Sequence, residues 1–301
     1  MIHNWEFNHL GMMVTDRDEI LSYYQSIGLG VSVGPQPLLP YTEGEGEITF
    51  FKELDGEPIS HRFVTGGAHN FKDGQSQIGN CQLEVYAMRP GPGMFINRYL
   101  EKKGDGINHI AFNTTNIERD TQFFLDRGCE LVFNVTTNGK TVENYIDTRL
   151  HGDLMISLRP PADNWEKSWR KNNESHPLVN KWKFLGLGIC VNDLESASSY
   201  YSRLGYKRIE EKKVRKKREI TSEEFYVSDV VFELIQAEKD SIYRDSLAQR
   251  GDGVAEMIFQ VSDLKTEMDL LETKGAKTLK VSDDKKIAYI DSCRKGNLLT
   301  R

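Results

Sequence analysis

The feature that most constrains this chain is an internal repeat. Residues 5–29 and 182–206 align without a gap, and ten of the 25 paired positions are identical. A second pair of segments, GDGINHIAF from Gly104 and GDGVAEMIF from Gly251, aligns in the same way. The second half of the chain therefore repeats the first, and a repeat on this scale determines the fold before any single element does.

The first half also repeats within itself. Asn8-His9 and Asn108-His109 are 100 residues apart, and they occupy corresponding places in two similar segments. The sequence thus predicts four related modules, which begin near Trp5, Gly104, Trp182 and Gly251.

Each module has the pattern of a strand, a helix and further strands. In the first module, residues 7–14 are typical of a strand, and Asp16 with Glu19 three residues later predicts a helix N-cap. Gly28 predicts the end of that helix. Later strands are expected at 47–51 and 81–88. The predicted fold class is α+β, with four tandem βαβββ modules arranged as domains at 1–160 and 181–301, joined by a linker at 161–180.

Composition limits the function. The 301 residues are 38% hydrophobic and carry a net charge of −6, which suits a globular protein and argues against a general nucleic-acid binder. The sequence contains no apolar run long enough to cross a membrane and no secretory signal. Its four cysteines form no CxxC pair and are expected to be reduced. We therefore expect a cytoplasmic protein with no nucleic-acid or membrane partner.

Four βαβββ units in two pairs resemble the vicinal oxygen chelate superfamily, which includes glyoxalase I, methylmalonyl-CoA epimerase and extradiol dioxygenases. The first half is most similar to methylmalonyl-CoA epimerase, through FNHLGMMVTDRDEILSYYQSIGLG, CQLEVYAMRPG, GDGINHIAFNTTNIERDTQFFLDRG and YIDTRLHGDLMISLRPP. The resemblance implies that each pair of modules forms one cup-shaped sheet with four metal-ligand positions. In the first half these positions fall on His9, Glu84, His109 and Ser157, and the family pattern has a glutamate where Ser157 stands.

The residues themselves support the first three ligands. Side chains alternate between the faces of a strand, so His9 shares its face with Gly11, and Glu84 shares its face with Gln82. Two imidazoles and one carboxylate form a normal ligand set for a divalent transition metal with open positions. The sequence predicts one such ion, which Co, Zn, Ni, Mn or Fe could each satisfy. Two alternatives stay open: each histidine is a hydrogen-bonded core residue, or Gln82 replaces Glu84 as the ligand.

The same four positions in the second half hold Gly186, Glu233, Glu256 and Arg301. Both histidines are missing there, so we expect Arg301 to form an ion pair with the two glutamates. The second half is then expected to act as scaffold, lid or interface.

Two further residues are candidates for moving protons. Glu47 matches an epimerase strand glutamate with an acid/base role, and the alternative is an edge-strand charge. His151 precedes the strand of Ser157 and could replace the missing carboxylate, although a solvated turn histidine fits the same pattern.

The sequence predicts a metal-dependent isomerase, epimerase or lyase that acts on a small carbonyl substrate, acyl thioesters included, through a metal-stabilised enolate. One alternative is an Fe(II)-dependent extradiol-type dioxygenase, because two histidines and a carboxylate form a facial triad. The other is a non-catalytic small-molecule binding or resistance protein. The expected partner is a small-molecule substrate, and a homodimer stays open.

Overall fold

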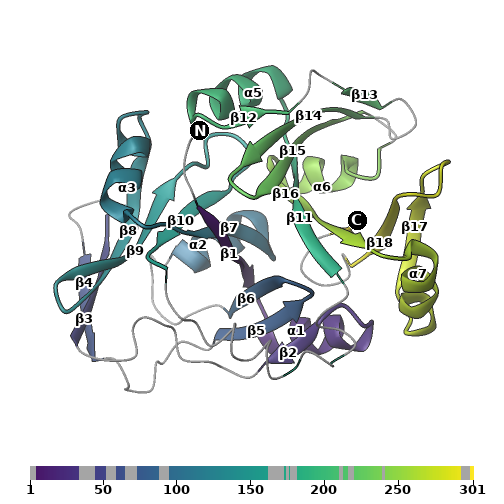
Figure 1. Cartoon of the computed structure of the whole chain (residues 1–301), viewed down its shortest axis with the longest axis horizontal. Coiled ribbons are helices and arrows are strands. Elements are labelled where there is room, and N and C mark those ends of the chain that lie inside the picture. Colours follow the sequence, from purple (N-terminus) through teal and green to yellow (C-terminus); the bar gives the residue numbers. More distant parts are fainter. Residues whose placement is uncertain are drawn as a thin grey trace.

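The computed structural model describes residues 5–33, 45–51, 59–64, 73–87, 95–161, 173, 176, 182–209, 213–215, 220–238, 241–292 and 299–301. Each half of the chain forms one mixed β-sheet with helices beside it (Figure 1). The paired βαβββ modules predicted from the repeat are confirmed. Most of the expected linker at 161–180 lies outside the described residues.

The first half forms a 10-stranded sheet of order β2-β5-β6-β1-β7-β10-β9-β8-β3-β4. Its elements are β1 (Glu6–Val14), α1 (Arg17–Ser26), β2 (Val31–Val33), β3 (Glu45–Phe50), β4 (Ile59–Val64), β5 (Asp73–Ile78), β6 (Cys81–Ala87), α2 (Phe95–Lys103), β7 (Gly106–Asn113), α3 (Ile117–Leu125), β8 (Glu130–Thr137), β9 (Lys140–Asp147) and β10 (Met155–Arg159).

The second half forms a 9-stranded sheet in which β12-β14-β15-β11-β16-β19-β18-β17 is the main order and β13 pairs with β14. Its elements are β11 (Trp182–Cys190), α5 (Leu194–Arg203), β12 (Lys207–Arg208), β13 (Lys213–Arg215), β14 (Ile220–Val227), β15 (Val230–Ala237), α6 (Arg244–Arg250), β16 (Gly253–Val261), α7 (Leu264–Thr273), β17 (Lys277–Val281), β18 (Ala288–Asp291) and β19 (Leu299–Thr300).

The same helix start recurs in all four modules. The N-cap side chain accepts a hydrogen bond from the backbone N–H three residues later in each case, which satisfies one of the helix's orphan donors. The N-cap residues are Asp16, Asn116, Asp193 and Asp263. Gly28, with φ of 82°, lies just after the end of α1, as expected from the sequence.

One expected strand joins a different module from the one predicted. The strand expected at 47–51 is β3, which pairs with β4 on one side and with β8 of the second module on the other. The reason is that β8 would otherwise be the sheet edge, with a row of backbone groups lacking sheet partners. The β3–β4 hairpin covers that edge.

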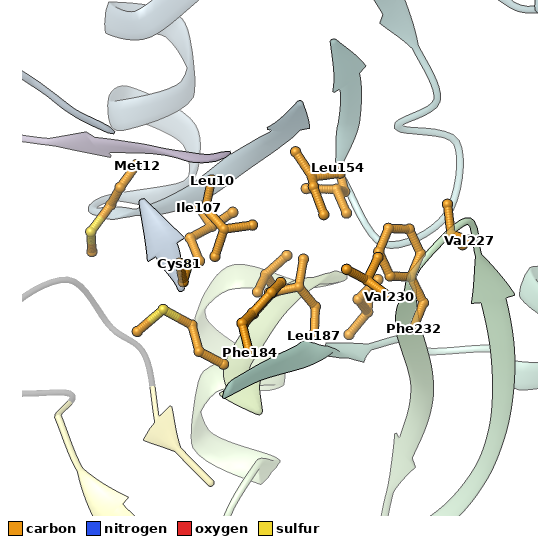
Figure 2. Close-up of a cluster of buried hydrophobic side chains, with 14 of the residues drawn as sticks. Leu10, Met12, Cys81, Ile107, Leu154, Phe184, Leu187, Val227, Val230 and Phe232 are labelled. Atoms are coloured by element: carbon orange, nitrogen blue, oxygen red, sulfur yellow. The ribbon is translucent and has the colours of Figure 1, made fainter. Parts of the chain in front are cut away.

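The two halves share one hydrophobic core. Leu10 of β1 and Leu187 of β11 are both fully buried in the same cluster, and Phe7 packs on Phe184 with ring centroids 4.7 Å apart. Figure 2 shows residues of both halves meeting there, including Met12, Ile107, Val230 and Phe232. The faces of the two sheets that carry these side chains therefore pack against each other.

Two turns fix how the halves are joined. Asp229, in the β14–β15 turn, accepts from the backbone N–H of Phe7 at 3.0 Å. Asn80, in the corresponding β5–β6 turn, accepts from the backbone N–H of Phe184 at 2.6 Å. Each half thus caps the first strand of the other through repeat-related residues. No helix among the described residues is long and apolar enough to cross a lipid bilayer.

Candidate metal and substrate site

The central strands place the predicted ligands on one face of the first sheet. Gly11 of β1 pairs with His109 of β7 on one side and with Glu84 of β6 on the other. His9 lies two residues before Gly11 and shares its face. His9, Glu84 and His109 are all at most 3% exposed. We call these three residues, with the side chains that contact them, the first site.

The two imidazoles face each other. The Nε2 atoms of His9 and His109 lie 3.3 Å apart, and their rings are nearly perpendicular. Gly11 makes this arrangement possible, because a Cβ atom there would lie 1.7 Å from His109 Cε1. A side chain at position 11 is therefore incompatible with the imidazole where it stands.

Neighbouring asparagines fix the orientation of both rings. His9 Nδ1 lies 2.6 Å from Asn8 Oδ1, and His109 Nδ1 lies 2.8 Å from Asn108 Oδ1. The Asn8 amide is itself oriented, because its Nδ2 donates to Asn113 Oδ1 at 3.1 Å. Since an amide oxygen only accepts, each Nδ1 carries the proton and each Nε2 presents a lone pair. This outer contact is the kind that orients metal-binding histidines.

Both histidines are held in the neutral form. Burial lowers the pKa of His9 well below its ordinary value, and the Arg159 guanidinium, 3.4 Å from His9 Nδ1, lowers it further. Burial also lowers the pKa of His109, with smaller contributions from His9 and Arg159. Two neutral nitrogens whose lone pairs converge repel each other unless a proton donor or a cation lies between them. Tyr145 supplies one donor, since its hydroxyl lies 3.0 Å from His109 Nε2.

Glu84 completes the donor set. Its Oε2 lies 3.4 Å from His9 Nε2 and accepts a short hydrogen bond from the Tyr86 hydroxyl. Its Oε1 accepts from Gln82 Nε2 at 3.2 Å. Burial raises the pKa of Glu84, and Arg159 and the Tyr86 hydroxyl oppose that change. Gln82 therefore orients the Glu84 carboxylate through a hydrogen bond. In the alternative drawn from the sequence, Gln82 would be the metal ligand in place of Glu84.

The donor chemistry fits a divalent cation. Donors that bind one ion at about 2.0–2.2 Å lie roughly 3–3.5 Å from each other, which includes the spacings of His9 Nε2 from both His109 and Glu84. In the described part of the chain, no group of three or more His, Cys, Asp or Glu side chains is already arranged as a metal site. The hydroxyls of Tyr86 and Tyr145 hydrogen-bond to the ligand atoms of Glu84 and His109, so a bound ion would replace these two hydrogen bonds.

The fourth ligand position holds Ser157, which contacts a carboxylate from a neighbouring strand. Ser157 pairs with Ala111 on β7 and is fully buried, as the sequence mapping implies for this slot. Its hydroxyl donates to Glu143 Oε1 of β9 at 2.6 Å. Arg159 Nε lies 3.7 Å from the same oxygen, and Glu143 is 6% exposed.

Two buried acceptors line the same face beside Glu84. Gln75 pairs with Glu84, and Gln77 pairs with Gln82, so their side chains share the face of the first site. The Oε1 atoms of both glutamines are buried and accept no hydrogen bond from the part of the chain that the structure describes. A buried acceptor that lacks a partner costs about 1–3 kcal/mol, so this wall favours a ligand that carries donors.

The structure does not bring Glu47 or His151 to this site. Ile48 pairs with Val135, which pairs with Glu143, so Glu47, the residue before Ile48, lies on the opposite face of the sheet. This register directs Glu47 away from the first site, and its expected role in proton transfer stays a prediction. The His151 ring lies 5.5 Å from the Tyr200 ring of α5, where the two halves meet.

The second half has the same register with different side chains. Gly188 pairs with Glu256 and with Glu233, as Gly11 does with His109 and Glu84. Arg301 Nη2 lies 2.6 Å from Glu233, and its Nε lies 3.2 Å from Glu256. The expected ion pair is confirmed. We call Glu233, Glu256 and Arg301 the second site.

Sequence reasoning missed Tyr145, Glu143 and Arg159. A signal for Tyr145 was present, because NYIDT from Asn144 repeats as AYIDS, and strand alternation then adds Glu143 to the same face. Arg159 lies outside the segments that the repeats align, so they did not identify it.

Comparison with known proteins supports the superfamily. Residues 187–289 match the Glyoxalase/Bleomycin resistance protein/Dioxygenase superfamily. No curated protein matches the sequence. A triple mutant of 4-hydroxymandelate synthase from Streptomyces coelicolor has a similar structure, with a TM-score of 0.64 and 15% identity over 98% of this chain and 90% of that one.

Two other solved structures are similar. One is a fusion protein of a xylose isomerase-like TIM barrel and 4-hydroxyphenylpyruvate dioxygenase, with a TM-score of 0.59 and 11% identity over 92% of this chain and 40% of that one. The other is methylmalonyl-CoA epimerase from Mycobacterium tuberculosis, with a TM-score of 0.35 and 22% identity over 39% of this chain and 83% of that one. At these identities the similarity of the first two structures concerns the fold.

Proposed function

We propose that this chain belongs to the Glyoxalase/Bleomycin resistance protein/Dioxygenase superfamily, whose pattern residues 187–289 match, and that its first site is the centre of a divalent-metal-dependent enzyme. The reaction is isomerisation, epimerisation or lysis of a small carbonyl compound through an enolate. The observation that carries this proposal is the pair of neutral Nε2 atoms 3.3 Å apart, each ring fixed by its own asparagine.

His9, Glu84 and His109 would hold the ion. A divalent ion polarises a carbonyl oxygen and stabilises the negative charge of an enolate. The chain's own side chains do the rest: Asn8 and Asn108 orient the imidazoles, and the buried sheet face excludes water. The order His, Glu, His along the chain favours the isomerase class over the dioxygenase class.

The unsatisfied oxygens of Gln75 and Gln77 bear on the substrate. They lie on the face of the first site beside Glu84, and a substrate hydroxyl or amide N–H would satisfy them. This favours a carbonyl compound that also carries hydrogen-bond donors.

A specific observation favours a second candidate, an Fe(II)-dependent dioxygenase. Two histidines and one carboxylate are a facial triad, and the fold matches two structures whose names include 4-hydroxymandelate synthase and 4-hydroxyphenylpyruvate dioxygenase. The position of the carboxylate argues against it, because the family's dioxygenases take theirs from the slot that Ser157 fills here.

Elemental analysis of protein purified without chelator tests the proposal. We expect about one divalent ion per chain, lost in His9→Ala and in His109→Ala, since each removes one of few donors. His151→Ala is the matched control, because this histidine lies away from the first site. Full metal content in the His9→Ala/His109→Ala double variant would contradict the assignment.

The reaction class is separated by two measurements on the metal-loaded protein. Solvent deuterium that appears at the carbon beside a substrate carbonyl supports enolate chemistry. Oxygen consumption coupled to turnover, without deuterium exchange, favours the dioxygenase. A metal-loaded protein that binds a ligand but gives neither signal would identify a non-catalytic binding protein.

A further inference from the structure

The first site holds a buried carboxylate that binding of an ion by His9, Glu84 and His109 does not use. Glu143 comes from β9 and is 6% exposed, and its Oε1 accepts from the Ser157 hydroxyl at 2.6 Å. Burying a carboxylate is costly unless it is paired, and Arg159 at 3.7 Å provides the compensating charge. A buried carboxylate maintained at this cost calls for a role.

Its position is bracketed by contacts to both histidines. Tyr145, two residues along β9 and on the same face, has its hydroxyl 3.0 Å from His109 Nε2. Arg159, the charge partner of Glu143, has Nη1 3.4 Å from His9 Nδ1. Glu143 is therefore linked to His9 through Arg159, and it shares its face with the tyrosine that contacts His109.

Ser157 explains why the carboxylate is supplied from another strand. The corresponding residue in the second site is Arg301, whose long side chain reaches both glutamates. Serine is too short to do this, and its hydroxyl donates to Glu143 instead. Ala111, which pairs with both Ser157 and His9, is small and fully buried on the same face.

We infer that Glu143 is the proton-transferring carboxylate of the first site, positioned by Ser157 in the slot that lacks a carboxylate of its own. The inference rests on the proposed enolate chemistry. In the step, the C–H bond beside the substrate carbonyl breaks, the proton goes to a Glu143 oxygen, and the electron pair moves onto the carbonyl oxygen. Glu143 then returns the proton to carbon, so no oxidant or reductant is consumed.

The test follows exchange of the carbon-bound hydrogen with D2O by NMR, using metal-loaded full-length protein. The probes are 2-substituted acyl thioesters, hemithioacetals and cyclic ketones. Glu143→Gln keeps the size of the side chain but removes the base, so exchange should slow by about 10²–10⁴-fold with metal content unchanged. Glu143→Gln exchanging within about twofold of wild type would overturn the inference.

Glu223→Gln is the matched control. Glu223 is 7% exposed and likewise accepts from a serine, Ser198, at 2.5 Å and pairs with an arginine, Arg208, at 3.2 Å, but it lies in the second half. Its substitution should leave exchange and metal content unchanged. A loss equal to that of Glu143→Gln would show that the effect is a general consequence of breaking a buried Ser–Glu–Arg cluster.

A second variant separates catalysis from folding. Ser157→Glu in the Glu143→Gln background returns a carboxylate to the fourth slot and should restore part of the exchange rate. Absence of any rescue in a folded, metal-loaded double variant would contradict the inference. If wild-type protein holds metal but exchanges none of the probes, the enolate chemistry fails, and the inference fails with it. That outcome is distinct from failure of Glu143 alone.

Discussion

The first and second sites occupy the same sheet positions and solve the same electrostatic problem differently. Both sites contain a buried glutamate, which is Glu84 on β6 in the first site and Glu233 on β15 in the second. In the second site the chain supplies its own cation, because Arg301 contacts both glutamates. In the first site His109 takes the place of Glu256 and Ser157 that of Arg301, and His9 adds a second neutral imidazole where the second half has Gly186.

The difference shows how a repeat can keep a fold while losing a site. Although burial opposes its charged form, Glu256 and Glu233 raise the pKa of the Arg301 guanidinium. The Tyr243 hydroxyl adds a hydrogen bond to Glu256 at 2.7 Å. A guanidinium with two carboxylates is self-contained, so the second site needs no ligand to be stable, whereas we expect a bound cation to stabilise the first site.

The largest expected loss of stability follows from removing the cation of the second site. Arg301→Met removes the cation and leaves Glu233 and Glu256 buried without it, which should lower the free energy of unfolding by about 3–5 kcal/mol. Urea unfolding measures the change. Arg208→Met is the control, because Arg208 pairs with Glu223 from an exposed position and should cost about 1 kcal/mol or less. Equal losses in the two variants would contradict a special role for the second site.

The next largest expected effect is stabilisation of the first site by a divalent ion. A divalent ion that binds only the folded chain stabilises it by about 2.7 kcal/mol at 100 times its dissociation constant. Chelator-treated wild type should gain this stability when Zn²⁺ or Co²⁺ is returned, and His9→Ala should not. Glu256→Gln should gain as much as wild type, although it starts from a lower stability, since its site has no histidines. A gain that survives in His9→Ala would place the ion elsewhere.

Gly11 in the first site and Gly188 in the second occupy equivalent positions, so substituting each of them compares the two sites directly. The expected effect is smaller. A Cβ at Gly11 would lie 1.7 Å from the rigid His109 ring, while a Cβ at Gly188 would lie 2.3 Å from Cγ of the more adaptable Glu256 side chain. Gly11→Ala should therefore cost about 1–3 kcal/mol and lower metal affinity, and Gly188→Ala should leave metal affinity unchanged. Metal titration of Gly11→Ala at wild-type affinity would contradict the packing of His109 against Gly11.

The smallest effect is on pH dependence in chelator-treated protein. Burial lowers the pKa of His9 and His109 in the folded state, so below about pH 6.5 the unfolded chain binds protons that the folded chain does not. The free energy of unfolding should therefore decrease as the pH is lowered, by at most about 1.4 kcal/mol per pH unit for each histidine. Glu84 opposes this at lower pH, because its raised pKa lets the folded state bind a proton first.

Urea midpoints between pH 7.5 and 5.5 test this dependence. The His9→Gln/His109→Gln variant cannot titrate at these positions and should lose most of the slope. Wild type and variant with the same slope would show that the two histidines do not carry it.

The repeat made much of this protein predictable. Ten identities between residues 5–29 and 182–206 related the two halves. The Asn-His pairs at 8–9 and 108–109 then divided the first half into two modules and identified two strands that lie side by side. These predictions hold because the repeat, the strand alternation and the helix caps are local patterns whose spacing is fixed by backbone geometry.

What only the tertiary structure decided concerns residues that meet across strands far apart in sequence. The sequence could not show that β3 crosses to β8 and turns Glu47 away from the first site, because strand pairing depends on which edge is free. Nor could it show that Glu143 reaches Ser157, or that Arg159 lies against His9, since these contacts depend on strand order and register. Local patterning determined which side chains share a face, and long-range pairing alone determined which of them touch.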